Sequence, residues 1–176
     1  MSIKICIAGL TASGKTTLGN TLEKELGIEH INPSYKDSEK TTDELIKFLE
    51  NIKPKYVKSF DERIVKLAKG KDCIISTWHG PWIIKDATIR VWLDVSEGER
   101  ARRWAKAHKI SIAEARKIVH IKDELTKRQF KLAYKKDMDM TVFDLHINYE
   151  KVTMLEAVAI ISMLAIARSK NKVNNK

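Results

Sequence analysis

The chain has 176 residues, and its 33 Lys and Arg against 23 Asp and Glu give a formal net charge of +10. This length suits one compact domain, and the ordinary hydrophobic content argues against a disordered or fibrous protein. Basic residues recur along the whole sequence, so we expect a diffuse field that attracts phosphorylated ligands, although any solvated basic surface has the same composition.

Strands and helices alternate along the predicted chain. Short apolar runs rich in β-branched residues predict strands at 3–8, 28–31, 73–77, 88–95 and 143–149. Helices are expected at 15–26, 41–52, 57–70, 96–136 with a break near 110, and 153–168. This alternation predicts an α/β fold with a five-stranded parallel sheet flanked by helices in three layers.

Two cysteines and one long apolar run bear on where the protein works. Cys6 and Cys73 have no metal-site spacing, which favours a reduced, cytoplasmic compartment. The apolar run at 157–167 is far shorter than the roughly 20 residues that cross a bilayer. The first strand begins within three residues and leaves no room for a signal segment. We therefore expect no membrane association.

The segment GLTASGKT, residues 9–16, matches the phosphate-binding pattern G-x-x-x-x-G-K-[ST] between a predicted buried strand and a helix. Gly9 and Gly14 let successive backbone N–H groups converge on one phosphate. Lys15 is expected to reach the β- and γ-phosphates, and Thr16 to offer its hydroxyl to Mg²⁺. The expected phosphate-binding set is Gly9, Thr11, Ala12, Ser13, Gly14, Lys15, Thr16 and Thr17. The motif predicts the three-layer P-loop NTPase fold and binding of ATP or GTP.

The rest of the chain indicates which P-loop class this is. The base-reading element Asn/Thr-Lys-x-Asp of GTPases is absent from the sequence. Two inserts suit a small kinase instead: an acceptor-binding insert at 32–70 and a basic helical lid at 96–140. We expect one domain over residues 1–176, a monomer, with a disordered tail at 169–176.

Four segments carry a family resemblance: NPSYKD, FDERIVKLAKGKDCIIS, GPWIIKDATIRVWLDVSEGERARRWAK and KRQFKLAYKKDMDMTVFDLHINYEK. Together they resemble the nucleoside monophosphate kinases, most closely the archaeal-type cytidylate kinases, over almost the whole chain. The resemblance implies that ATP, with Mg²⁺, gives its γ-phosphate to CMP or dCMP. A phosphate acceptor is already nucleophilic, so no strong base is required.

By the same resemblance, Arg100 and Arg103 close over the phosphates as lid residues, with Arg128 a third candidate. Guanidinium groups at fixed positions stabilise the charge that spreads over a transferring phosphoryl group. The stretch ERARRW is equally typical of a solvated helix face, and that alternative stays open.

The acceptor site departs from the family pattern. Thr77 and Trp78 stand where the family has a Gly-Arg pair, and a second family arginine falls at Ile121 and Lys122. These replacements are not conservative for gripping a monophosphate. Lys36, Trp78 and His79 are candidates to compensate, as a point charge, a flat surface for the base and a donor to it.

Other acceptor-site candidates have equally plausible structural roles. Trp82 suits either the substrate or core packing, and Asp37 and Asp61 suit either the acceptor or the surface. Asp94, at the end of the fourth strand, is a candidate to hold Mg²⁺ through water or to cap the next helix.

Two alternative functions remain open at the sequence level. The first is a P-loop kinase for another small phosphorylated acceptor or for a nucleoside. The second is an ATP-binding, RNA- or ribosome-associated factor without phosphotransfer, which the basic charge permits but no RNA-binding motif supports.

Overall fold

The computed structural model describes residues 2–33 and 42–174 of the chain. Five strands form one sheet in the order β2-β3-β1-β4-β5, and every pairing in it is parallel. The strands are β1 (Lys4–Gly9), β2 (Glu29–Ile31), β3 (Cys73–Ile75), β4 (Ile89–Asp94) and β5 (Leu145–Asn148). The predicted fold class is therefore confirmed, with strand ends that differ from the predicted ones by at most two residues.

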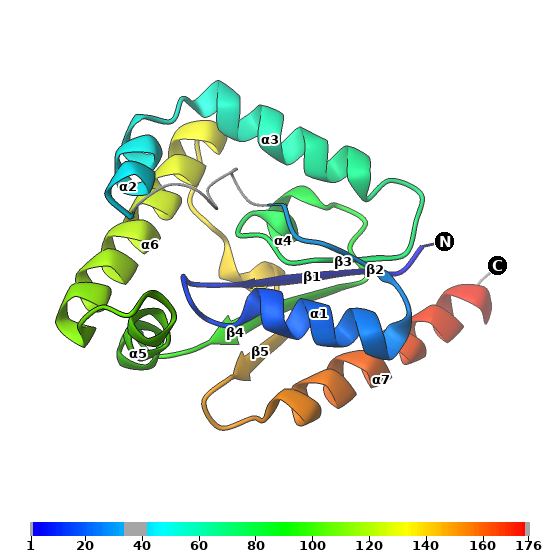
Figure 1. Ribbon diagram of the computed structural model, residues 1–176. Helices are drawn as coiled ribbons and strands as arrows, with labels where there is room; N and C mark the ends of the chain where they lie inside the picture. The colour runs from blue at the N-terminus through cyan, green and yellow to red at the C-terminus, as the bar shows by residue number, and fades with distance from the viewer. Residues whose placement is uncertain (1, 34–41, 175–176) are drawn as a thin grey trace.

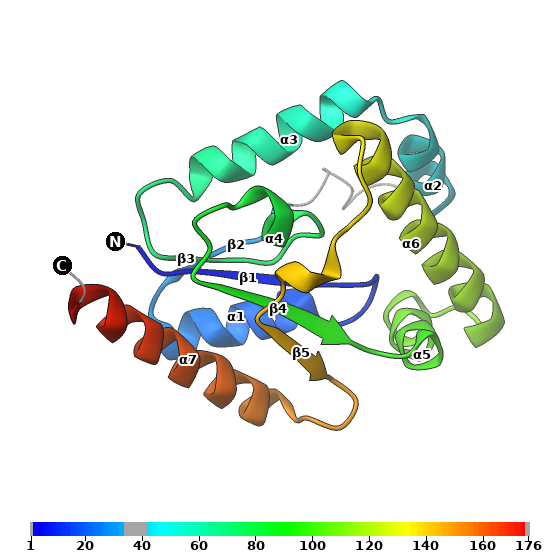
Figure 2. The same ribbon diagram turned by 180° about the vertical axis from the view of Figure 1, so that it is seen from behind.

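Helices cover both faces of the sheet (Figure 1). They are α1 (Lys15–Leu26), α2 (Thr42–Asn51), α3 (Pro54–Leu67), α4 (Gly80–Ile83), α5 (Glu97–His108), α6 (Ile112–Tyr134), a 3₁₀ turn at Met140–Val142, and α7 (Met154–Asn174). Helices α1 and α7 lie on one face and α3 and α4 on the other, as both views show (Figures 1 and 2). This sandwich gives the three predicted layers.

Two apolar clusters cover the sheet, one on each face, and a third, smaller cluster lies between α5 and α6. The larger sheet cluster joins Leu18 and Leu22 of α1 to Ile161 of α7 across the sheet residues. The smaller sheet cluster packs Phe60 and Ile64 of α3 on the opposite side. Since strand β1 is buried along its whole length, both of its faces are used, as expected for a central parallel strand.

Helices α5 and α6, here called the lid helices, form an arm beside the carboxyl ends of the strands. Lys109 adopts a left-handed conformation and ends α5, and Ser111 accepts a hydrogen bond from the Glu114 N–H to start α6. Helix α6 also packs against α2 and α3 (Figure 2). The helices of the segments predicted as lid and as acceptor-binding insert therefore contact each other directly.

Two details differ from the sequence prediction. The segment HGPW begins the short helix α4, because Pro81 fits the first turn of a helix, whereas no helix was predicted there. Helix α7 continues to Asn174, although a disordered tail was predicted from residue 169. No helix in the described part of the chain has the length and apolarity needed to cross a membrane.

Candidate active site

The phosphate-binding loop lies between β1 and α1 and depends on two glycines. A Cβ at Gly9 would lie 2.6 Å from Ser13 Oγ and 2.9 Å from the Leu93 carbonyl oxygen. Gly14 has φ +100°, and a Cβ there would lie 2.9 Å from the Tyr149 ring. These positions exclude larger residues, so the loop keeps the tight curvature that turns its N–H groups toward a ligand.

Lys15 is held across this loop. Its Nζ donates to the Gly9 carbonyl at 2.8 Å and to the Leu10 carbonyl at 3.0 Å. Desolvation lowers the pKa of Lys15 from 10.5 to about 8, against the opposing effect of the nearby Asp123 carboxylate. A partly desolvated ammonium of this kind gains charge stabilisation when an anionic ligand arrives.

A buried ion pair joins the lid helices to the loop. The Arg100 guanidinium and the Asp123 carboxylate approach to 2.6 Å, and both side chains are almost fully buried. Both side chains also bind the backbone of Thr11: its N–H donates to Asp123 at 2.9 Å, and its carbonyl accepts from Arg100 at 3.1 Å. Arg100 also donates to the Val95 carbonyl. Arg100 thus fixes the loop from the lid side.

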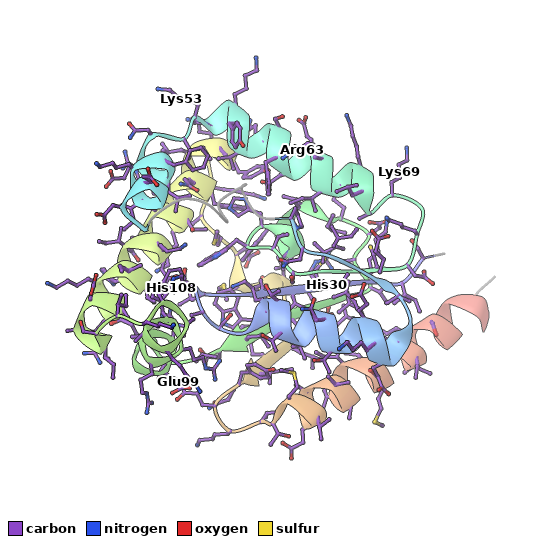
Figure 3. The ribbon with its side chains drawn as sticks, viewed as in Figure 1. His30, Lys53, Arg63, Lys69, Glu99 and His108 are labelled. Carbon is purple, nitrogen blue, oxygen red and sulfur yellow. The ribbon has the colours of Figure 1, made fainter. Side chains whose placement is uncertain are left out.

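Arg103, one turn further along α5, lies at the edge of the loop. It donates to the carbonyl of Ser13 at 3.1 Å and to that of Tyr149 at 3.3 Å, and it pairs with Glu99 at 3.0 Å. Figure 3 shows Glu99 on α5. About one third of the Arg103 side chain is exposed, so its guanidinium is accessible to a phosphate.

A pocket of about 450 Å³ opens from the loop, a size typical of small-ligand sites. The loop contributes Thr11, Ala12, Lys15 and Thr16, and the segments after β2 and β3 contribute Asn32, Pro33, Ser76, Thr77, Trp78 and His79. Helix α3 adds Phe60 and Asp61, and the lid helices add Trp104, Lys122, Thr126 and Gln129. The loop, the segments after β2 and β3, helix α3 and the lid helices therefore share one cavity.

A carboxylate–imidazole pair forms part of the pocket wall. His79 Nδ1 lies 2.9 Å from Asp61 Oδ2, and the Tyr134 hydroxyl donates to the same oxygen at 2.6 Å. His79 and Asp61 are 4% and 3% exposed. Three buried side-chain polar atoms in the described part of the chain have no hydrogen-bond partner, and two of them, His79 Nε2 and Trp104 Nε1, belong to residues of this pocket. Such atoms are available to hydrogen-bond a ligand or an ordered water.

A hydrogen-bonded chain orients the opposite wall. His30, which lies beside α1 in Figure 3, contacts the Ser76 hydroxyl through Nε2 at 2.7 Å. Ser76 in turn donates to Asn32 Oδ1 at 3.1 Å. Burial lowers the pKa of His30, which favours its neutral form at physiological pH. Ser76 and Asn32 therefore hold fixed orientations at the pocket.

Comparison with known proteins assigns the family. A sequence model described as the cytidylate kinase-like family matches residues 34–151. The chain belongs to this family. It is 31% identical over 151 residues to a cytidylate kinase of Thermococcus kodakarensis, covering 82% of this chain and 78% of that protein. It is 33% identical over 165 residues to a cytidylate kinase of Sulfurisphaera tokodaii, covering 89% and 92%.

Solved structures support the fold of this cytidylate kinase-like chain. A deoxyadenosine kinase from M. mycoides superposes with a TM-score of 0.62 at 17% identity, covering 92% of this chain and 98% of that one. A shikimate kinase from Bacteroides thetaiotaomicron gives 0.62 at 17% identity, covering 92% and 97%. At these identities the likeness concerns the P-loop kinase fold alone.

Within this cytidylate kinase-like fold, some predicted site residues lie together. Lys15, Thr16, Asp61, Trp78 and His79 all line the pocket, and the Lys15 Nζ lies 5.5 Å from the centroid of the Trp78 ring. Other P-loop positions in the predicted set surround them in the same turn between β1 and α1.

Other predicted site residues lie apart from the pocket. Trp82 donates to the Asp139 carbonyl at 2.8 Å and packs on Phe130. Of the two roles that the sequence left open for Trp82, this contact corresponds to core packing. Arg128 is exposed on α6, and Asp94 is exposed at the end of β4; neither lines the pocket. Lys36 and Asp37 lie outside the described residues.

Sequence reasoning missed several residues of this site. Asp123 is the buried partner of Arg100, and Tyr134 shares Asp61 with His79. Trp104 and Gln129 also line the pocket from the lid helices. The sequence held one signal, Asp123 itself, because it is an acidic residue in a basic amphipathic helix. The positions of Tyr134, Trp104 and Gln129 along their helices gave no comparable indication that they belong to the site.

Proposed function

We propose that this chain is an ATP-dependent nucleoside monophosphate kinase that phosphorylates CMP or dCMP. The observation that carries the proposal is the single cavity that joins the phosphate-binding loop to the acceptor-side residues Asp61, Trp78 and His79. Family membership supports the same activity, since its cytidylate kinase relatives are named for it.

The donor half of the site suits a nucleoside triphosphate. The loop N–H groups and the amino end of α1 would hold the β-phosphate, and Lys15 would move from the loop carbonyls to the phosphate oxygens. The Thr16 hydroxyl, at the pocket wall, would be suited to hold Mg²⁺, and the ion would supply positive charge that offsets the charge of the phosphates. Arg103 would add a second cation at the loop edge.

The lid helices would contribute by position and by excluding water. Trp104 and Lys122 project from them into the pocket lining, with the Lys122 Nζ 4.7 Å from the centroid of the Trp104 ring. A cavity covered by such side chains lowers the local dielectric and limits transfer of the phosphoryl group to water. This arrangement matches a reaction that needs positioning and charge neutralisation more than a base.

A nucleoside or another hydroxyl acceptor is the second candidate. Among the described lining residues the cations are Lys15 and Lys122, and no arginine is present. An acceptor monophosphate is usually gripped by the bidentate donors that arginine supplies. An imidazole paired with a carboxylate is also suited to take a proton from a hydroxyl.

A panel assay separates these functions. ADP release is measured with ATP and Mg²⁺ against each ribo- and deoxyribonucleoside monophosphate, with nucleosides and RNA tested in parallel. Stimulation by CMP or dCMP supports the proposal, and stimulation by cytidine or deoxycytidine alone supports the second candidate. Turnover that no acceptor raises and RNA alters would refute both.

A further inference from the structure

The carboxylate–imidazole pair of the pocket has a fixed geometry. Asp61 Oδ2 accepts from the Tyr134 hydroxyl at 2.6 Å and lies 2.9 Å from His79 Nδ1. The imidazole packs edge-on against Phe130, with ring centroids 5.2 Å apart, and against Tyr134 at 6.2 Å. Because two aromatic rings and a carboxylate hold it, the imidazole has little freedom to rotate.

This geometry determines what His79 offers to a ligand. An Nδ1–H donated to a carboxylate leaves Nε2 of the neutral ring as a hydrogen-bond acceptor. Nε2 is buried and has no partner among the described residues, and His79 lines the pocket. A buried polar atom without a partner is costly, so the ligand is expected to supply an N–H or O–H donor here.

A second residue of the pocket also carries an acceptor. Gln129 lines the same pocket, and one N–H of its amide donates to the Leu49 carbonyl at 2.6 Å. Its Oε1 is an acceptor, like Nε2 of His79, and its second N–H remains a donor. Phosphate oxygens of an ionised nucleotide cannot satisfy acceptors, and a hydroxyl donates only once. An exocyclic amino group has two N–H bonds.

We propose that His79 Nε2 accepts a hydrogen bond from the exocyclic amino group of the acceptor base, and that this contact selects cytosine over uracil. Cytosine presents an amino donor where uracil presents a carbonyl acceptor, and a carbonyl facing Nε2 leaves two buried acceptors opposed. The inference rests on the proposed function for the identity of the acceptor, and it makes His79 the specificity-determining residue of that site.

Direct binding tests this contact separately from turnover. Dissociation constants of CMP, UMP and N4,N4-dimethyl-CMP are measured by calorimetry on the full chain. We expect CMP to bind roughly 10- to 100-fold more tightly than UMP, and the dimethyl compound, which lacks both amino hydrogens, to bind as weakly as UMP. This comparison needs no variant and so does not depend on the folding of one.

Two variants locate the effect on Nε2. In His79→Asn the amide nitrogen replaces Nδ1 as donor to Asp61 and the Nε2 acceptor is lost, so the CMP preference is expected to fall to within about threefold. In His79→Gln the longer side chain returns an oxygen near the Nε2 position, and part of the preference is expected to return. His146→Asn, the same substitution at an exposed histidine of β5 that does not line the pocket, is the matched control and is expected to leave CMP and UMP binding unchanged.

Several outcomes would overturn the inference. Equal binding of CMP and UMP by the parent, tight binding of the dimethyl compound, or an undiminished preference in His79→Asn would each do so. With dCMP and dUMP measured in parallel, a loss of affinity in His79→Asn that is confined to the ribonucleotides would assign Nε2 to a sugar hydroxyl instead. If CMP is preferred and the preference depends on His79, yet no phosphate is transferred, the proposed function fails and the recognition of the amino group stands.

Discussion

Replacement of Arg100 by methionine is expected to destabilise the protein strongly. The Arg100 and Asp123 side chains are 4% and 6% exposed, so the change leaves a carboxylate buried without its counter-ion. Loss of one partner of such a pair costs about 3–5 kcal/mol. For a chain of this size that free energy corresponds to a fall in melting temperature of roughly 6–20 °C. Urea and thermal unfolding without nucleotide measure both quantities.

The double variant Arg100→Met/Asp123→Leu separates charge burial from lost packing. Both charges are absent in it, so its loss of stability is expected to be about 2–3 kcal/mol smaller than the sum of the two single losses. Arg102→Met is the matched control on the same helix, because Arg102 pairs with Glu99 while its side chain is 62% exposed. Such a surface pair contributes about 0–1 kcal/mol. A loss below about 1 kcal/mol in Arg100→Met, or additive single losses, would refute the buried-pair argument.

Three substitutions and one pH titration test the phosphate-binding loop and the arginine at its edge. Lys15→Ala is expected to abolish phosphotransfer while Lys24→Ala, exposed on the same helix, retains it; transfer by Lys15→Ala would remove the loop from the mechanism. Because the pKa of Lys15 in the free protein is about 8, the affinity for ATP is expected to fall as pH rises through 8, and binding titrations that stay flat from pH 7 to 9 would contradict this. Gly14→Ala is expected to cost more stability than Gly27→Ala, since both have positive φ but only Gly14 faces the Tyr149 ring; chemical denaturation compares them. Arg103→Ala is expected to lower kcat about 10-fold or more with stability nearly unchanged, and equal rates in single-turnover assays would exclude it from the reaction.

Features with a fixed local spacing could be predicted from the sequence. The loop at residues 9–16 binds phosphate through consecutive backbone groups, so its glycines and lysine recur at set intervals. The parallel sheet follows from apolar strands that alternate with helices. In both cases the physical requirement acts within one short segment.

Features that depend on distant residues could not be predicted in the same way. Asp61, His79 and Tyr134 meet only after α3, the segment after β3 and α6 have packed together. Arg100 was expected to face phosphates, yet its guanidinium is committed to Asp123 and to the Thr11 carbonyl. In the sequence of an amphipathic helix, a buried arginine cannot be told from an exposed one, because the acidic partner that keeps it buried lies on another helix. Trp82 poses the same problem, because an aromatic residue suits a core as well as a binding site.

The shared carboxylate of Asp61 has a consequence for natural variation in this protein. One oxygen connects three segments, through partners 18 and 73 residues away in sequence. A change at Asp61, His79 or Tyr134 is therefore expected to alter the proposed acceptor contact and the packing of α6 at once. These positions are expected to vary together, as a set, so that the chain reaches a different acceptor preference through coordinated substitutions instead of single steps.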